Sequence, residues 1–135
     1  MQWVFDTSIT MAWCFEDEKN ADSESLLDRI TTTPAAVPQI WSLEVGNVLA
    51  LAMKKGRIKP AQRAQFVELL ATFPITIDPE TATRALGVTL NLADQHQLTT
   101  YDAAYLELAM RLGVPLATLD DELRRAATAS GVPLL

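Results

Sequence analysis

Four carboxylates stand where the sequence pattern favours apolar or turn residues. Asp6 and Asp120 each directly follow a short apolar run. Glu44 interrupts the apolar spacing of a helical segment, and Asp102 lies in the first turn of another. Carboxylates that converge repel one another unless they raise their pKa values or hold a cation. These four residues are therefore candidates for proton transfer or for binding a metal ion.

Three of these acids also have an ordinary structural explanation. Asp6 can form an Asx-turn or cap the helix that follows it, and Asp120 or Asp121 can cap the last helix. Asp102 fits a T-x-x-D capping pattern that begins at Thr99. Taken singly, none of the three requires a functional site.

Glu44 is harder to explain, because a buried, unpaired carboxylate is costly unless an arginine or a backbone amide satisfies it. In a parallel α/β sheet, strand carboxyl ends and helix amino ends share one edge, where ligands bind. We expect Asp6, Asp102 and Asp120 at that edge, with Glu44 beside them. The cation that suits carboxylate oxygens is a hard one, Mg²⁺ or Mn²⁺. The implied chemistry is metal-assisted attack of water on a phosphodiester.

The composition excludes several other chemistries. The chain has 135 residues, a net charge of −6, one His and one Cys. A single Cys rules out a disulfide framework, and a single His rules out multi-His metal sites. The acidic balance, by itself, argues against a basic-patch nucleic-acid binder. No signal peptide and no membrane-spanning apolar run is visible, so we expect a cytoplasmic protein without a membrane partner.

Short apolar runs alternate with helical patterns along the chain. The expected strands lie at 2–5, 36–37, 75–77, 114–118 and 132–135; the expected helices lie at 20–30, 39–55, 80–97 and 101–112, with others beginning after Asp6, at Pro60 and at Asp120 or Asp121. Non-alternating apolar runs are typical of buried parallel strands. The alternation predicts an α/β fold with a short-stranded, mainly parallel sheet between helices. We expect one domain over residues 1–135.

Four segments, in order along the chain, resemble a known family. They are Asp6-Thr7-Ser8 with Ala12-Trp13-Cys14-Phe15 and Asp17-Glu18, then Trp41-Ser42-Leu43-Glu44-Val45-Gly46-Asn47, then YDAAYLELA at 101–109, and Leu116-Ala117-Thr118-Leu119-Asp120. Together they resemble the PIN domain of VapC-type toxins over nearly the whole chain. The segment at 101–109 is the most specific of the four.

The resemblance implies a PIN-like three-layer α/β/α sandwich. It further implies an endoribonuclease that depends on Mg²⁺ or Mn²⁺ and acts as the toxin of a VapBC-type toxin–antitoxin pair. The expected partners are an RNA substrate, a VapB-type antitoxin that covers the acidic groove, and a second copy of the chain in a homodimer.

The resemblance also assigns roles to single residues. The acidic quartet of the family falls on Asp6, Glu44, Asp102 and Asp120. Asp6 and Asp102 are the expected direct metal ligands, and the other two complete the site directly or through water. The expected supporting residues are Ser8, Asn47, Thr118 and Asp121. The T-x-D spacing selects Asp120 as the fourth acid, but Asp121 remains an alternative.

A basic stretch lies between residues 45 and 67, which contain no acid. Its five basic residues are Lys54, Lys55, Arg57, Lys59 and Arg63. They can bind RNA phosphates. They can equally be cations favoured near a helix carboxyl end and solvated in a loop. Both interpretations stay open at the level of sequence.

Two other functions compete with a nuclease. A receiver-like phosphoacceptor domain also gathers acids at strand ends, but it needs paired acids after the first strand and a late Lys. Here Asp6 is single, and no Lys occurs after Lys59. A catalytically silent PIN module that binds protein is the second alternative, and the presence of all four acids argues against it.

Overall fold

A four-stranded parallel sheet forms the centre of the molecule. The structure is a computed structural model that describes residues 2–135. The strands are β1 (Trp3–Phe5), β2 (Ala35–Val37), β3 (Ile75–Ile77) and β4 (Leu116–Ala117). They lie in the order β3-β2-β1-β4, and every pair is parallel. The predicted short-stranded parallel sheet is confirmed.

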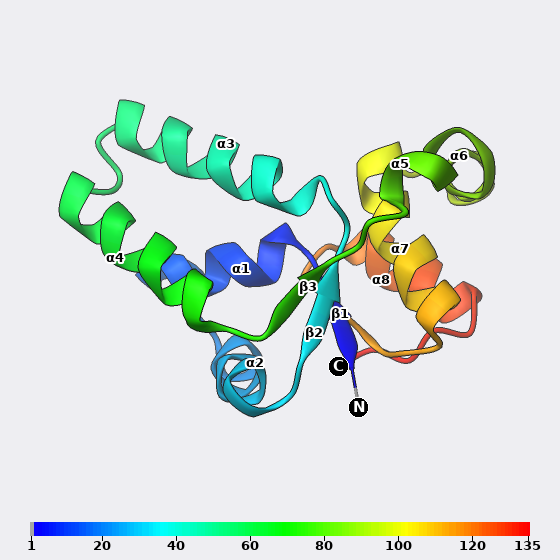
Figure 1. Cartoon of the computed structure of the whole chain (residues 1–135), viewed down its shortest axis with the longest axis horizontal. Coiled ribbons are helices and arrows are strands. Elements are labelled where there is room, and N and C mark those ends of the chain that lie inside the picture. Colours follow the sequence, from blue (N-terminus) through cyan, green and yellow to red (C-terminus); the bar gives the residue numbers. More distant parts are fainter. Residues whose placement is uncertain (1) are drawn as a thin grey trace.

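Helices cover both faces of this sheet. They are α1 (Thr7–Cys14), η1 (Glu16–Glu18), α2 (Ala21–Thr32), α3 (Trp41–Lys54), α4 (Pro60–Thr72), α5 (Thr81–Arg84), η2 (Ala85–Thr89), α6 (Leu90–His96), α7 (Thr100–Leu112) and α8 (Asp121–Ala129). Figure 1 shows α1 and α2 on one side of the strands and α7 and α8 on the other, with α3 and α4 as a projecting hairpin. This is the expected three-layer α/β/α arrangement. Among residues 2–135, no helix combines the length and apolarity needed to cross a bilayer.

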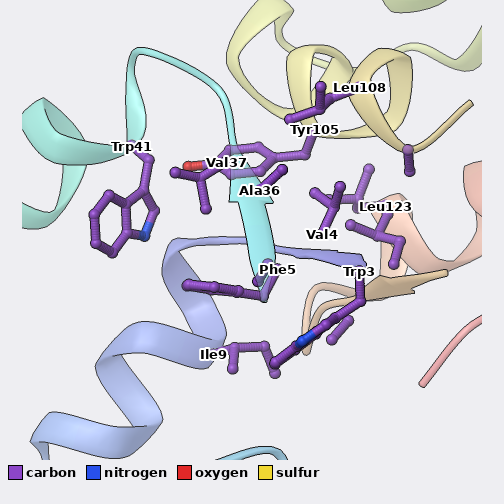
Figure 2. Close-up of a cluster of buried hydrophobic side chains, with 14 of the residues drawn as sticks. Trp3, Val4, Phe5, Ile9, Ala36, Val37, Trp41, Tyr105, Leu108 and Leu123 are labelled. Atoms are coloured by element: carbon purple, nitrogen blue, oxygen red, sulfur yellow. The ribbon is translucent and has the colours of Figure 1, made fainter. Parts of the chain in front are cut away.

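The core forms on both faces of β1, because successive side chains of a strand point in opposite directions. Trp3 and Phe5 lie toward α1, where they pack near Ile9, whereas Val4 lies toward α7 and α8 with Leu123 (Figure 2). All five side chains are at most 1% exposed. Full burial of a large apolar side chain contributes roughly 1.5–3 kcal/mol, so this layer holds the short strands in place.

Polar side chains and glycine fix where several helices begin and end. The Asn20 side chain accepts a hydrogen bond from the Ser23 amide at the start of α2, and Thr99 does the same for the Asp102 amide at the start of α7. Helix α7 ends at Gly113, whose φ of 66° lies in the left-handed region that glycine adopts at little cost. These caps determine which turn of α7 carries Asp102.

Three predicted elements differ from the structure. The helix expected over 80–97 is divided into α5, η2 and α6, because Gly87 has non-helical angles (φ −116°, ψ −105°) within η2. The strand expected over 132–135 is reduced to a single bridge between Leu134 and Leu116, and the strand over 114–118 is reduced to β4. Pro115 and Pro133 have no amide hydrogen, which limits the sheet hydrogen bonding that these segments can make.

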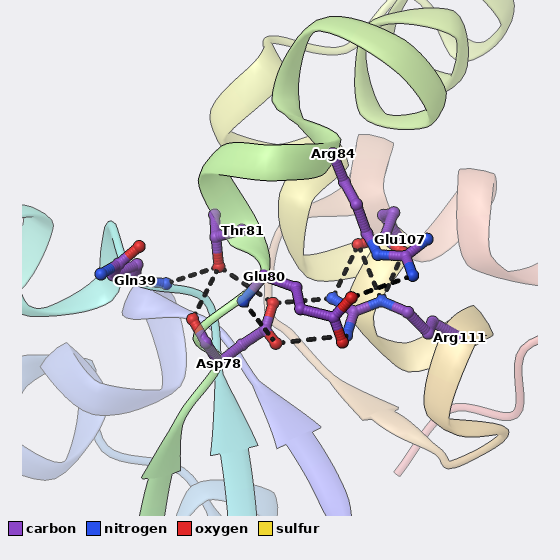
Figure 3. A network of polar contacts seen from close by, with 7 residues as sticks. All are labelled: Gln39, Asp78, Glu80, Thr81, Arg84, Glu107 and Arg111. Atoms are coloured by element: carbon purple, nitrogen blue, oxygen red, sulfur yellow. Dashed lines mark hydrogen bonds and ion pairs between the residues drawn. The ribbon is translucent and has the colours of Figure 1, made fainter.

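An ion network joins the end of β3 to α7 and to the segment before α3. Arg111 donates hydrogen bonds to Asp78 and Glu107, whose side chains are both buried. The Thr81 hydroxyl donates to Asp78 and accepts from the Gln39 amide (Figure 3). Through these contacts Asp78 braces α7 and the entry to α3, the two helices that carry Asp102 and Glu44.

Candidate active site

The candidate site lies where the chain reverses its direction across the sheet. From β1 the chain proceeds to β2 and β3 on one side, and it then returns to place β4 on the other side of β1. Such a switch point leaves a crevice beyond the strand ends, and ligands of open α/β sheets bind there. Phe5 is paired with Ala117, so Asp6 and Thr118 leave their strands side by side.

Asp6 is the centre of a hydrogen-bond network at this switch point. Its Oδ1 accepts hydrogen bonds from the Ser8 hydroxyl at 2.5 Å and from the Ile9 amide at 3.2 Å, and its Oδ2 accepts from the Thr118 hydroxyl. The residue is only 4% exposed. Asp6 therefore caps α1, as the structural explanation expected, and it also links the ends of β1 and β4.

The two hydroxyls beside Asp6 continue the network into the backbone before α8. Ser8 Oγ accepts from the Leu119 amide at 2.9 Å, and Thr118 Oγ1 accepts from the Asp120 amide at 3.0 Å. Each hydroxyl thus accepts one hydrogen bond from a backbone amide and donates one hydrogen bond to the Asp6 carboxylate. The predicted supporting residues Ser8 and Thr118 lie against Asp6 and fix its carboxylate.

Glu44 reaches this region from the first turns of α3 and is held by two hydroxyls. Its Oε1 accepts from Tyr105 at 2.6 Å and from Thr7 at 3.1 Å. Burial, together with the adjacent Glu44 charge, raises the pKa of the Tyr105 hydroxyl far above its usual range, so Tyr105 remains a donor. The sequence predicted the acid at position 44 but neither of its two donors.

The remaining acids lie at helix amino ends. Asp102 is half-buried in the first turn of α7, and Asp120 is the N-cap of α8, with its Oδ2 accepting from the Leu123 amide at 2.8 Å. Asp121 is the first residue of α8 and is exposed. Asp120 rather than Asp121 therefore caps α8, and this cap uses only one of its two carboxylate oxygens.

The acids influence one another electrostatically. Burial raises the pKa of Asp6 to about 6, against hydrogen bonds that lower it, and the charge of Asp102 raises it further. The pKa of Asp102 is raised by burial and then by the charges of Asp120, Glu44 and Glu122. Two members of the predicted quartet, Asp120 and Glu44, are thus among the main influences on Asp102.

A family model for the PIN domain matches residues 3–129 of the chain. The chain belongs to the PIN domain family. The resemblance inferred from the four sequence segments is thereby confirmed, and so is the fold expected from it. A curated relative, Ribonuclease VapC3 of Pyrobaculum aerophilum, is 27% identical over 123 residues, which cover 91% of this chain and 92% of the relative.

Solved structures share the PIN fold over almost the whole chain. PAE2754 from Pyrobaculum aerophilum matches with a TM-score of 0.71 and 24% identity, covering 99% of this chain and 83% of that one. VapBC2 from Rickettsia felis, bound to a DNA fragment from its promoter, matches with a TM-score of 0.68 and 14% identity, covering 100% and 98% of the two chains. At these identities the likeness establishes the fold.

The carboxylate side chains at this site suit a hard divalent cation in the chemistry of their oxygens and in their charge. Carboxylate oxygens are the preferred ligands of Mg²⁺ and Mn²⁺, and a cation would offset the neighbouring negative charges that, after burial, raise the pKa of Asp102. Within residues 2–135, however, no three His, Cys, Asp or Glu side chains are arranged to hold a metal ion as they stand. An ion bound to the carboxylates as they stand would therefore keep water molecules among its ligands, as Mg²⁺ commonly does.

The other expected site residues make no hydrogen bond to Asp6 in the part of the chain that the structure describes. Asn47 is exposed on α3, and its side chain makes no hydrogen bond within residues 2–135. The basic stretch lies around the turn between α3 and α4, the outer end of the hairpin in Figure 1. Lys54 is ten residues along α3 from Glu44, which corresponds to roughly 15 Å of helix.

Arg57 differs from its basic neighbours. It donates to Asp17 at 2.9 Å and to Glu18 at 2.8 Å, and its guanidinium lies over the Phe15 ring at 3.7 Å from the centroid. Arg57 therefore joins the α3–α4 turn to η1, and an RNA phosphate would have to compete with two carboxylates for it.

Proposed function

We propose that this chain is a metal-dependent endoribonuclease that hydrolyses RNA phosphodiester bonds. The observation that carries the proposal is the buried Asp6 carboxylate at the switch point, held by Ser8 and Thr118 and electrostatically coupled to Asp102. Membership of the PIN family and the similarity to a relative named Ribonuclease VapC3 support it. Asp94 carries the same chemical group on the surface of α6 and has none of these features.

Mg²⁺ or Mn²⁺ would be held by Asp6 and Asp102, with Glu44 and Asp120 completing the site directly or through water. When bound, the ion would neutralise the scissile phosphate and increase the acidity of the attacking water. Glu44 or Asp120 orients that water or accepts its proton. Ser8 and Thr118 keep the Asp6 carboxylate facing the crevice. No protein nucleophile is required, and the resemblance to the family implies a 5′-phosphate and a 3′-hydroxyl as products.

The chain is further proposed to be the toxin of a VapBC-type pair, which inhibits translation and growth in the cytoplasm when free. Support for an antitoxin partner comes from an apolar groove of about 350 Å³ between α3, α4 and β3. Its lining includes Val45, Leu49, Val67, Leu70 and Ile77. An apolar segment of a small partner protein would fit such a groove. A homodimer remains part of this proposal.

Incubation with mixed RNA in Mg²⁺, Mn²⁺ or EDTA tests the nuclease proposal. We expect cleavage with either metal, none in EDTA, and near-complete loss for Asp6→Asn with the fold retained. Asp94→Asn is the matched control and should cleave like the wild type. Full activity of Asp6→Asn in Mg²⁺ would remove Asp6 from the mechanism. RNA binding without cleavage would favour a silent PIN module, and labelling by a small phosphodonor would favour a receiver.

A further inference from the structure

Two hydroxyls outside the acidic quartet converge on a single oxygen of Glu44. Tyr105 and Thr7 both donate to Oε1, and their own oxygens lie 3.1 Å apart. Among residues 2–135, no hydrogen bond reaches Oε2 of the same carboxylate. One oxygen of Glu44 is therefore committed to protein donors, and the other is open.

The two donors are placed beside the other acids of the site. Thr7 directly follows Asp6, and Tyr105 lies three residues after Asp102, on the same face of α7. The Glu44 carboxylate is thus tied at once to the start of α1 and to α7. A shift of either element relative to α3 would break one of the two hydrogen bonds.

Because the Tyr105 hydroxyl is buried, loss of its hydrogen bond to Glu44 would be destabilising. Tyr105 is 1% exposed and lies among the core side chains in Figure 2, so little water can replace Glu44 as its acceptor. A buried donor without a partner is destabilising, and a hydroxyl bound to a carboxylate is among the stronger hydrogen bonds. The orientation of Glu44 is therefore set by the core as well as by its own helix.

We propose that Tyr105 and Thr7 are positioning residues that hold Oε1 of Glu44 in place and leave Oε2 as the only oxygen free to contact a ligand. The inference rests on the proposed function, because the open oxygen would act on a divalent ion or on the attacking water. Glu44 then works through one oxygen whose place is fixed relative to Asp6 and Asp102.

Replacing Tyr105 with Phe removes the donor and keeps the ring. For Tyr105→Phe we expect kcat for a defined RNA oligonucleotide to fall about 10-fold, with KM changed less than about twofold. Mn²⁺ affinity, measured by calorimetry without RNA, should fall at least about threefold. Tyr101→Phe is the matched control, since Tyr101 is exposed on the same helix. Thr7→Val should give a smaller loss, and Thr7→Ser should retain activity.

A double-mutant cycle separates positioning from a general loss of structure. In a Glu44→Gln background, Tyr105→Phe should cause little further loss of Mn²⁺ affinity or kcat. An undiminished loss in that background, or a Tyr105→Phe variant equal to the wild type, overturns the inference. In both cases the wild-type enzyme still cleaves RNA with Mn²⁺, so the proposed function survives. A wild type that neither binds Mn²⁺ nor cleaves RNA overturns both.

Discussion

Asp78 and Arg111 form a two-pronged ion pair between the end of β3 and the last turn of α7. Nη2 of Arg111 lies 2.6 Å from Oδ2 of Asp78, and Nη1 lies 3.2 Å from Oδ1. The remaining donors of Arg111 are directed at Glu107 and Glu80. One guanidinium therefore serves two buried carboxylates, Asp78 and Glu107, that belong to different elements.

Loss of Arg111 should destabilise the fold strongly. Arg111→Met leaves Asp78 and Glu107 buried without their cation, and removing one partner of a buried pair costs about 3–5 kcal/mol. Urea unfolding measures this change. Arg84→Met is the control, because the Arg84–Glu80 pair is partly exposed and of the i,i+4 type, worth about 0.3–0.5 kcal/mol. Similar losses for the two variants would contradict the role given to Arg111.

The same pair predicts a pH dependence of stability. Burial raises the pKa of Asp78, but hydrogen bonds from Arg111, the Glu80 amide and Thr81 outweigh it and hold that pKa below its ordinary value. A lowered carboxyl pKa stabilises the fold above the unfolded-state value, about 3.9, and this contribution is lost as the pH falls through the folded value. The stability gap between wild type and Asp78→Asn should be constant from about pH 5 to 8 and should shrink in stronger acid. Unfolding curves across this range check it, and a gap that widens on acidification would contradict it.

Adjacent aspartates at the start of α8 give a matched comparison. After burial, the charge of Asp120 is the strongest influence that raises the pKa of Asp102, and Asp121 is not among the main ones. Asn is as good an N-cap as Asp, so Asp120→Asn should change the melting temperature little. We expect it to reduce Mn²⁺ affinity and RNA cleavage several-fold, while Asp121→Asn resembles the wild type. The reverse ranking in calorimetry and cleavage assays would identify Asp121 as the site acid.

The groove between α3 and α4 can be tested separately from catalysis. Val67→Glu places a charge in the apolar lining, which should weaken capture of a cognate antitoxin at least about 10-fold. RNA cleavage by the free protein should not change. Leu86→Glu is the control, because Leu86 is 86% exposed and is not part of the lining. Co-purification with a co-expressed candidate antitoxin measures capture, and equal effects of the two variants would argue against the groove.

The sequence predicted the fold, and the elements on which the four acids lie, better than it predicted the hydrogen-bond partners of those acids. Apolar runs and capping residues are local signals, so the parallel sheet and the ends of α7 followed from them. The break at Gly87 did not, because a single glycine inside a periodic segment does not reveal whether the helix continues. Tyr105 resembled an ordinary core aromatic, since its hydroxyl contact with Glu44 spans 61 positions of sequence. Long-range hydrogen bonds of this kind have no local pattern.

The strand order also has a consequence for how the protein is made. The hydrogen bond from Thr118 to Asp6 joins residues 112 positions apart. During synthesis, the central strand and its aspartate emerge first, and the neighbouring strand β4 emerges after α7. The carboxylate of Asp6 therefore lacks the hydrogen bond from Thr118 until nearly all helices have been translated. A nascent chain of this topology therefore cannot complete the Asp6 site until β4 has been translated, so an unfinished chain lacks the assembled site.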